Sequence, residues 1–325
     1  MPYTFPKLSS SSIIHTSILL GTVIFVNAVA ADPVIPGTGQ HLVKVGDNFE
    51  EESWTFKHRF PKSSEEIDGR KRTPGGKASN GRWFEGMKRG QPDVIQRVAT
   101  PTGGLDGSEH ALLLRSLRTG IPNAPSYRLQ QDDFICNVIS RLGKKIPASQ
   151  TPNFVVRLFM PPVDEWENRR GPTFAIRAAG ETSMRGAFSS RHNEPYWPGM
   201  FINFEPNETS KRDYDTAFLT IRGNQRGITF RGPKIEQTGW WTFGMSFTPD
   251  GMVHYYASPG VDDLTEDDLI TSQYPYGYRC ERFRSLFFNV CNGDDGRTWS
   301  TSWIIDDAKL YVLRPDAHLR QAMKR

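Results

Sequence analysis

The chain has 325 residues, of which 40 are Lys or Arg and 36 are Asp or Glu, and its formal net charge is +4. Nucleic-acid-binding domains usually gather their positive charge on one helix or stripe, whereas this excess is small, so we expect no nucleic-acid partner. The length suits one β-sandwich domain.

Residues 1–30 resemble a secretory signal peptide. Lys7 precedes an apolar stretch at 18–26, and the small residues Ala28 and Ala30 suit cleavage after Ala30. The apolar stretch is too short to span a bilayer, so we expect no stable membrane span after cleavage. The alternative is an uncleaved membrane anchor. The pattern predicts an exported bacterial protein that is secreted or remains in the periplasm or cell envelope.

The three cysteines are Cys136, Cys280 and Cys291. An oxidising compartment would allow one disulfide and leave one thiol over. Cys280 and Cys291 flank a predicted strand at 283–290, which would hold them about 30 Å apart. Any bridge is therefore expected to involve Cys136.

The rest of the chain reads as short alternating strands between turns. Residues 31–46 carry Pro and Gly without a period and are predicted to be a linker, and 314–325 to be a basic C-terminal tail. About a dozen apolar-alternating segments follow Asp93 without a long helical period. The pattern predicts an all-β fold, an antiparallel two-sheet β-sandwich with long loops and at most short helices, in one domain at 47–313.

The segment 239–258 predicts its own register as a β-hairpin. Its turn is 248–251, where Pro249 sets φ and Gly251 takes a left-handed position. Alternation then places Trp241 and five further apolar side chains on the core face. The opposite face carries Trp240, His254 and Tyr256.

This hairpin, together with a last strand at 302–312, resembles the penultimate hairpin and closing strand of concanavalin A-like lectin and glucanase (LamG-type) jelly rolls. The resemblance covers about 49–313 by strand rhythm. It implies a carbohydrate ligand.

A second resemblance concerns Phe49-Glu50 and Ile305-Asp306-Asp307, which are similar to segments of galactose-binding-like carbohydrate-binding modules. There, such residues help to hold a structural calcium ion between the first and last strands. The resemblance implies a calcium site at Glu50 and Asp306, since Ca²⁺ prefers carboxylate and carbonyl oxygens. Alternatively, Asp306 and Asp307 form a turn or face solvent. We expect no other cofactor.

Alternation along the remaining strands places polar side chains opposite the core. The predicted ligand-binding residues are Arg157, Arg177, Arg222, Arg231, Asn203, Glu205, Trp240 and Asn289. If their strands share one sheet, this face would be cationic and suited to a carboxylate or sulfate. The alternative is an ordinary solvated face with Arg paired to acids.

These patterns favour an acidic or cell-envelope polysaccharide as partner. One reading is a binding protein. Another is a polysaccharide lyase, in which Arg157 or Arg177 would neutralise a uronate and His254 and Tyr256 would be catalytic. A glycoside hydrolase is less favoured because Glu205 has no evident carboxylate partner. A purely structural envelope protein is the third alternative.

Overall fold

The computed structural model describes residues 31–121, 123–185 and 190–324. The predicted signal peptide at 1–30 lies outside the described residues. Within those ranges no helix has the length and apolar character needed to cross a membrane.

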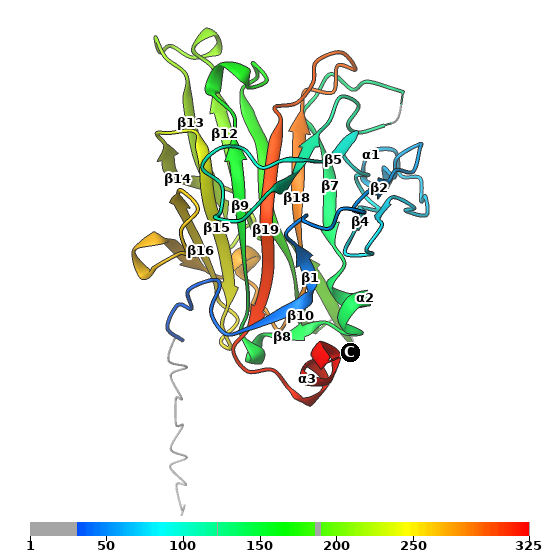
Figure 1. Ribbon diagram of the computed structural model, residues 1–325, viewed down its shortest axis with the longest axis vertical. Helices are drawn as coiled ribbons and strands as arrows, with labels where there is room; N and C mark the ends of the chain where they lie inside the picture. The colour runs from blue at the N-terminus through cyan, green and yellow to red at the C-terminus, as the bar shows by residue number, and fades with distance from the viewer. Residues whose placement is uncertain (1–30, 122, 186–189, 325) are drawn as a thin grey trace, which may run out of the picture. The chain divides into compact units, whose positions relative to one another are not determined.

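Two antiparallel sheets form the fold (Figure 1). Among the described residues, sheet A has eight strands, in the order β17-β16-β15-β9-β19-β6-β5 with β1 paired to β19. Its members are β1 (Gln40–Asp47), β5 (Val94–Ala99), β6 (His110–Arg115), β9 (Pro152–Met160), β15 (Gly239–Phe247), β16 (Val253–Pro259), β17 (Leu269–Gln273) and β19 (Trp303–Val312).

Sheet B has eleven strands within the described ranges, in the order β14-β13-β12-β10-β18-β7-β4-β3-β2, with β11 paired to β10 and β8 to β18. Its members are β2 (Phe56–Lys57), β3 (Lys77–Ala78), β4 (Trp83–Glu85), β7 (Gln130–Cys136), β8 (Ile146–Pro147), β10 (Gly171–Arg185), β11 (Arg191–Tyr196), β12 (Gly199–Glu205), β13 (Thr216–Arg222), β14 (Phe230–Ile235) and β18 (Arg282–Asn292).

Helical segments are short. They are α1 (Glu65–Asp68), α2 (Val138–Leu142), α3 (Ala317–Lys324), and 3-10 turns at η1 (Ala148–Gln150), η2 (Val163–Glu165), η4 (Asn207–Thr209), η5 (Glu266–Asp268) and η6 (Pro275–Gly277). The predicted antiparallel β-sandwich with short helices is therefore confirmed.

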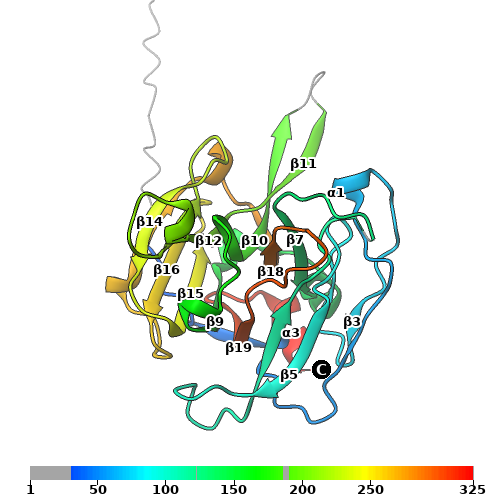
Figure 2. The ribbon, with the colours of Figure 1, turned by 90° about the horizontal axis from the view of Figure 1, so that it is seen from above.

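The core lies between the sheets. Seen from above, β16, β15, β9 and β19 form one layer and β12, β10, β18 and β7 the other (Figure 2). Alternate residues of facing strands fill the space between them, such as Phe154 and Val156 of β9 and Phe174 and Ile176 of β10, all fully buried. Burying such side chains gives about 1.5–3 kcal/mol each, which makes this layer the main stabilising feature.

The hairpin formed by β15 and β16 has the predicted register. Ser246 pairs with His254, Met245 with Tyr255, and Gly244 with Tyr256. Gly251 has φ +83°, and its N–H donates to the Thr248 carbonyl at 2.8 Å. The turn chemistry thus set both the register and the face of each side chain.

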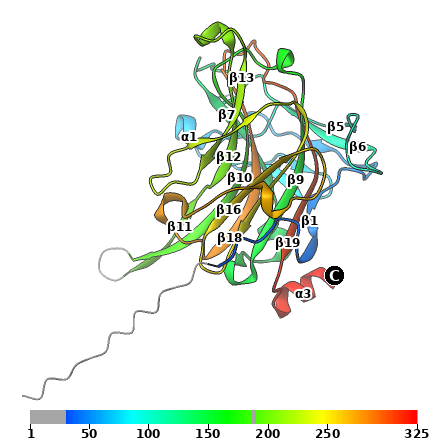
Figure 3. The ribbon, with the colours of Figure 1, turned by 90° about the vertical axis from the view of Figure 1, so that its left-hand side faces the viewer.

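Two predicted boundaries are wrong. The linker prediction for 31–46 fails at β1, which pairs with β19 and buries Leu42 and Val45 (Figure 3). The basic tail at 314–325 contains α3, and the Leu319 side chain of this helix is fully buried in the core. In both segments a few apolar side chains pack into the core, although most of the neighbouring residues are polar.

Cys136, Cys280 and Cys291 are all free thiols, and all three are buried. Burial raises the pKa of Cys136 to about 12 and that of Cys280 to about 11. Their environments are those of small core residues.

Candidate functional site

The residues predicted to share one ligand face are divided between the two sheets. Arg157, Trp240, His254 and Tyr256 belong to strands of sheet A. Sheet B contains the other six, namely Arg177, Asn203, Glu205, Arg222, Arg231 and Asn289. The prediction of a common face is therefore wrong, because alternation gives the face of a strand and not the sheet that the strand joins.

His254 has a structural environment. It is fully buried, and its ring nitrogens lie 2.9 Å from Thr248 Oγ1 and 2.7 Å from Ser272 Oγ. Burial lowers its pKa to about 4. With both nitrogens engaged and no exposed edge, His254 is not placed to serve as a catalytic base.

Tyr256 and Trp240 are covered by loops. Tyr256 packs with Val155 and Leu264, and burial raises its pKa to about 12. Trp240 packs edge-on against Phe159, and its Nε1–H donates to the Pro101 carbonyl at 3.2 Å. The structure thus gives the two predicted catalytic residues and Trp240 no open ligand face.

Arg157 is an ion-pairing residue. Its guanidinium is almost fully buried and contacts Asp307 at 3.1 Å and Asp263 at 2.6 Å. Its Nε also donates to the Val261 carbonyl. With these acceptors present, it has little capacity left for a ligand anion.

The two predicted calcium ligands do line one cavity, of about 370 Å³, at the outer side of sheet A. Glu50 Oε1 accepts from the backbone N–H groups of Glu109 and His110. Asp306 accepts from Ser108 Oγ and the Asp307 N–H, and burial raises its pKa to about 6. Glu50 offers a ligand atom within 4.8 Å of those of Glu109 and His110, a group that does not include Asp306, and the calcium site at Glu50 and Asp306 stays a prediction.

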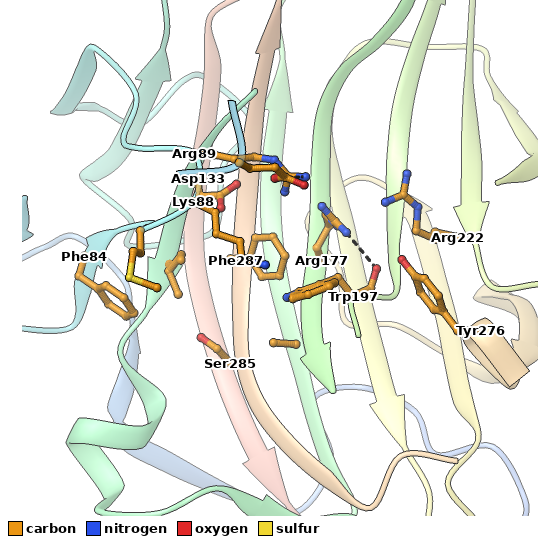
Figure 4. A pocket seen from close by; sticks show the side chains of 14 residues that line it. Phe84, Lys88, Arg89, Asp133, Arg177, Trp197, Arg222, Tyr276, Ser285 and Phe287 are labelled. Atoms are coloured by element: carbon orange, nitrogen blue, oxygen red, sulfur yellow. Dashed lines mark hydrogen bonds and ion pairs between the residues drawn. The ribbon is translucent and has the colours of Figure 1, made fainter. Parts of the chain in front are cut away.

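A different cavity, of about 440 Å³, opens on the outer face of sheet B. We call it the cationic pocket, after its four basic residues Lys88, Arg89, Arg177 and Arg222, which surround the aromatic residues Trp197, Tyr276 and Phe287. In Figure 4, Arg177 lies in the middle of the pocket, with Lys88 and Arg89 on one side of it and Arg222 on the opposite side.

The sheet register builds the floor of this pocket. Gly199 of β12 pairs with Arg177 on one side and with Arg222 on the other. A Cβ at Gly199 would lie 2.5 Å from Arg177 Cγ, so glycine is what leaves room for that arginine. Phe201 lies beneath both guanidinium groups, 5.3 Å from that of Arg177 and 4.8 Å from that of Arg222. Two arginines therefore share one buried aromatic ring as a cation–π partner.

Arg177 has polar partners but no ion pair among the described residues. Its side chain is 2% exposed and donates to Asn289 Oδ1 at 3.1 Å and to the Trp197 carbonyl at 3.0 Å. Its Nε has no hydrogen-bond partner. Burial, then Arg222 and Arg89, lower its pKa to about 9. Asp133 acts in the opposite direction, so this guanidinium is buried near two like charges and one carboxylate.

The neighbouring cations are only partly neutralised. Arg222 Nε also has no partner, and Lys88 Nζ lies 5.0 Å above the Trp197 ring. Arg89 pairs with Glu66 at 2.6 Å. One of the four basic side chains therefore has a carboxylate partner in the described structure.

Asp133 is the second acid of the pocket. It accepts a hydrogen bond from Asn289 Nδ2, and burial raises its pKa to about 6. Asn289 links it to Arg177, so the three side chains form a chain along the pocket floor. Both acids of the pocket have a partner, Glu66 in Arg89 and Asp133 in Asn289.

The other predicted residues of sheet B lie outside the pocket. Asn203 donates to the Phe201 carbonyl and to Thr220 Oγ1, and Glu205 is paired with Arg170 and Arg212. Arg231 stacks on Phe218 at 3.6 Å.

Sequence reasoning missed the loop residues of the pocket. Lys88 and Arg89 follow β4, Trp197 precedes β12, and Tyr276 lies in η6. Tyr276 has φ +61°, unusual for a non-glycine residue, and its N–H donates to the Asn224 carbonyl. Alternation is silent about such positions. The one local signal was the Lys88-Arg89 pair itself.

A scan against protein-family models finds no matching family. A search among curated proteins also finds no match. Similar solved structures do exist. A carbohydrate esterase of the Shiga toxin-encoding bacteriophage phi24B is 10% identical, with a TM-score of 0.39 over 71% of this chain and 90% of that chain.

An alginate lyase of Pseudomonas aeruginosa is 11% identical, with a TM-score of 0.38 over 68% of this chain and 87% of that chain. A GH131 β-glucanase catalytic domain of Podospora anserina is 10% identical, with a TM-score of 0.38 over 74% and 83%. At this distance the similarities carry no argument about chemistry. The structure confirms the β-sandwich, and the more specific resemblance to concanavalin A-like jelly rolls stays a prediction.

Proposed function

We propose that this protein is an exported polysaccharide-binding β-sandwich protein that recognises an acidic glycan in the cationic pocket of sheet B. The observation that carries the proposal is Arg177, which is almost fully buried, has one N–H without a partner, and lies beside other cations. A carboxylate or sulfate in the pocket would supply negative charge beside Arg177 and Arg222, neither of which has a carboxylate partner among the described residues.

The aromatic side chains favour a sugar over a free inorganic anion. Trp197, Tyr276 and Phe287 line the same cavity as the cations. Flat apolar rings suit the faces of sugar rings, while arginine forks suit their acidic groups. A uronate or sulfated sugar presents both surfaces at once.

The proposal is tested by binding to matched acidic and neutral polysaccharides, measured by isothermal titration calorimetry. We expect binding to the acidic polymers alone. Arg222→Gln should weaken it about tenfold or more, since a hydrogen bond to a charged group contributes about 1.5–3 kcal/mol.

Arg279→Gln is the matched control, because it removes one positive charge from a guanidinium that also stacks on an aromatic ring, that of Tyr274 at 5.5 Å, outside the pocket. It should leave affinity unchanged. Equal losses in both variants, or equal affinity for neutral glycans, would contradict the proposal.

A further inference from the structure

The positive charge on sheet B does not end at the cationic pocket. Arg222 ends β13, and Thr220, two residues earlier on the same face, pairs with Arg231 of β14. Phe218, the next residue of that face, pairs with Lys234. Arg231 and Lys234 therefore extend the face of Arg222 to the outermost strand of the sheet.

These two side chains are available for a ligand. Both are exposed, and within the described part of the chain neither forms an ion pair. The Arg231 guanidinium lies 3.6 Å from the centre of the Phe218 ring, which holds it flat on the sheet surface. The acid nearest along β12, Glu205, is already paired with Arg170 and Arg212.

The surface between the pocket and β14 carries uncharged residues. Its outward residues next to the cations are Gly199, Phe201 and Thr220, of which none is charged. Asn203 adds an amide beside Thr220. Phe201 and Asn203 are buried, and both the Arg177 and the Arg222 guanidinium groups lie near the Phe201 ring. A chain that crosses these strands would therefore meet Arg222 and the partly exposed Thr220 before it reaches β14.

The distance across this face exceeds one sugar. Five strand spacings separate β7, which carries Asp133, from β14, and at ~4.8 Å each they span about 24 Å before twist is considered. A single sugar ring is about as long as one such spacing. The surface therefore matches several consecutive sugars better than a monosaccharide.

We infer that the ligand is an extended acidic polysaccharide that crosses the strands of sheet B, and that Arg231 and Lys234 form an outer subsite that only longer chains reach. This inference rests on the proposed binding of acidic glycans in the cationic pocket. It adds the course of the ligand chain across the strands and a second binding position.

The test is a series of uronate oligosaccharides, from disaccharide to hexasaccharide, titrated into the unmodified protein and the double variant Arg231→Gln/Lys234→Gln. We expect affinity to rise with length in the unmodified protein. The double variant should lose about tenfold for the hexasaccharide and less than about twofold for the disaccharide.

Arg279→Gln serves again as the charge control and should behave like the unmodified protein at every length. Affinity that does not depend on length, or an equal loss for short and long oligosaccharides in the double variant, would overturn the outer subsite while leaving the pocket intact. Absence of binding to every acidic oligosaccharide would instead refute the proposed function.

Discussion

The outer faces of the two sheets both carry arginines, but the two sheets use them differently. On sheet A, Arg157 is buried between Asp307 and Asp263. On sheet B, Arg177 is equally buried, yet its partners are an amide and a carbonyl, and its charged neighbours include Arg222 and Arg89. In the first arrangement carboxylates contact the guanidinium directly, whereas in the second the carboxylate of Asp133 is linked to the guanidinium through Asn289.

This difference separates stability from binding. A buried arginine with carboxylate partners belongs to the internal structure, because removal leaves an uncompensated charge. A buried arginine without a carboxylate partner is costly to keep, and the proposed function supplies that partner as a ligand anion. Each of the following predictions challenges or refines that distinction, from the largest expected effect to the smallest.

The largest effect is expected at Arg157. Arg157→Gln leaves Asp307 buried with Lys309 as its remaining cation, so we expect a loss of about 3 kcal/mol in the free energy of unfolding. Arg177→Gln removes a charge whose partners among the described residues are an amide and a carbonyl, and it should cost clearly less. Urea denaturation of both variants measures the difference. A larger loss for Arg177→Gln would reverse the comparison.

The second prediction concerns His254 on sheet A. Because its pKa is lowered to about 4 in the folded protein, the unfolded chain binds its proton first as pH falls below the ordinary value of 6.5. Stability should therefore fall with pH, by about 2 kcal/mol between pH 6.5 and 5 from this group. His254→Gln keeps hydrogen-bonding capacity toward Thr248 and Ser272 and should lack this part of the pH dependence. Urea denaturation at both pH values measures the free energy of unfolding of the two proteins, and an equal loss in both would contradict the prediction.

The third prediction concerns Gly199 on sheet B. Gly199→Ala places a Cβ against Arg177 Cγ and should displace the guanidinium, which would weaken acidic-glycan binding about tenfold, or ~1.4 kcal/mol. Gly232→Ala is the matched control, since a Cβ there meets its nearest atoms at 3.4 Å, an ordinary contact. Titration of a short uronate oligosaccharide compares the two. Equal affinities would show that the position of Arg177 does not matter.

The smallest effect is expected at Glu205. Its ion pairs with Arg170 and Arg212 lie at the surface, where such pairs contribute about 0–1 kcal/mol. Glu205→Gln should change stability by no more than that and should leave binding of short oligosaccharides unchanged. A large loss of affinity would contradict this prediction and would indicate that the ligand binds near Glu205, at the end of β12.

The sequence predicted which side chains of a strand point away from the core, but it did not predict which strands lie next to one another. Alternation correctly placed Arg157, Arg177 and Arg222 opposite the core, and the turn at 248–251 fixed the hairpin register. Strand order depends on pairings between segments far apart in sequence, and alternation carries no information about it. For this reason alternation groups Arg157 with Arg177, although the two lie on the outer faces of opposite sheets.

The pocket itself required the three-dimensional structure. Tyr276 and Trp197 lie on irregular segments whose course is set by contacts with distant residues, such as the hydrogen bond from Tyr276 N–H to the Asn224 carbonyl. The covering of Tyr256 by Leu264 depends in the same way on a loop. Whether a side chain on the outer face of a sheet is exposed depends on the loops that cover that face. Loops have no hydrophobic periodicity from which their course could be predicted.

The most direct test of the central claim is one titration with two forms of the same polymer. A soluble polyuronate and its carboxyl-reduced, neutral derivative share linkage and length and differ in charge. The structure predicts that the protein binds the polyuronate, that added salt weakens this binding, and that the reduced polymer does not bind. Equal binding of both polymers would contradict the claim that Arg177 and Arg222 form a site for an acidic sugar.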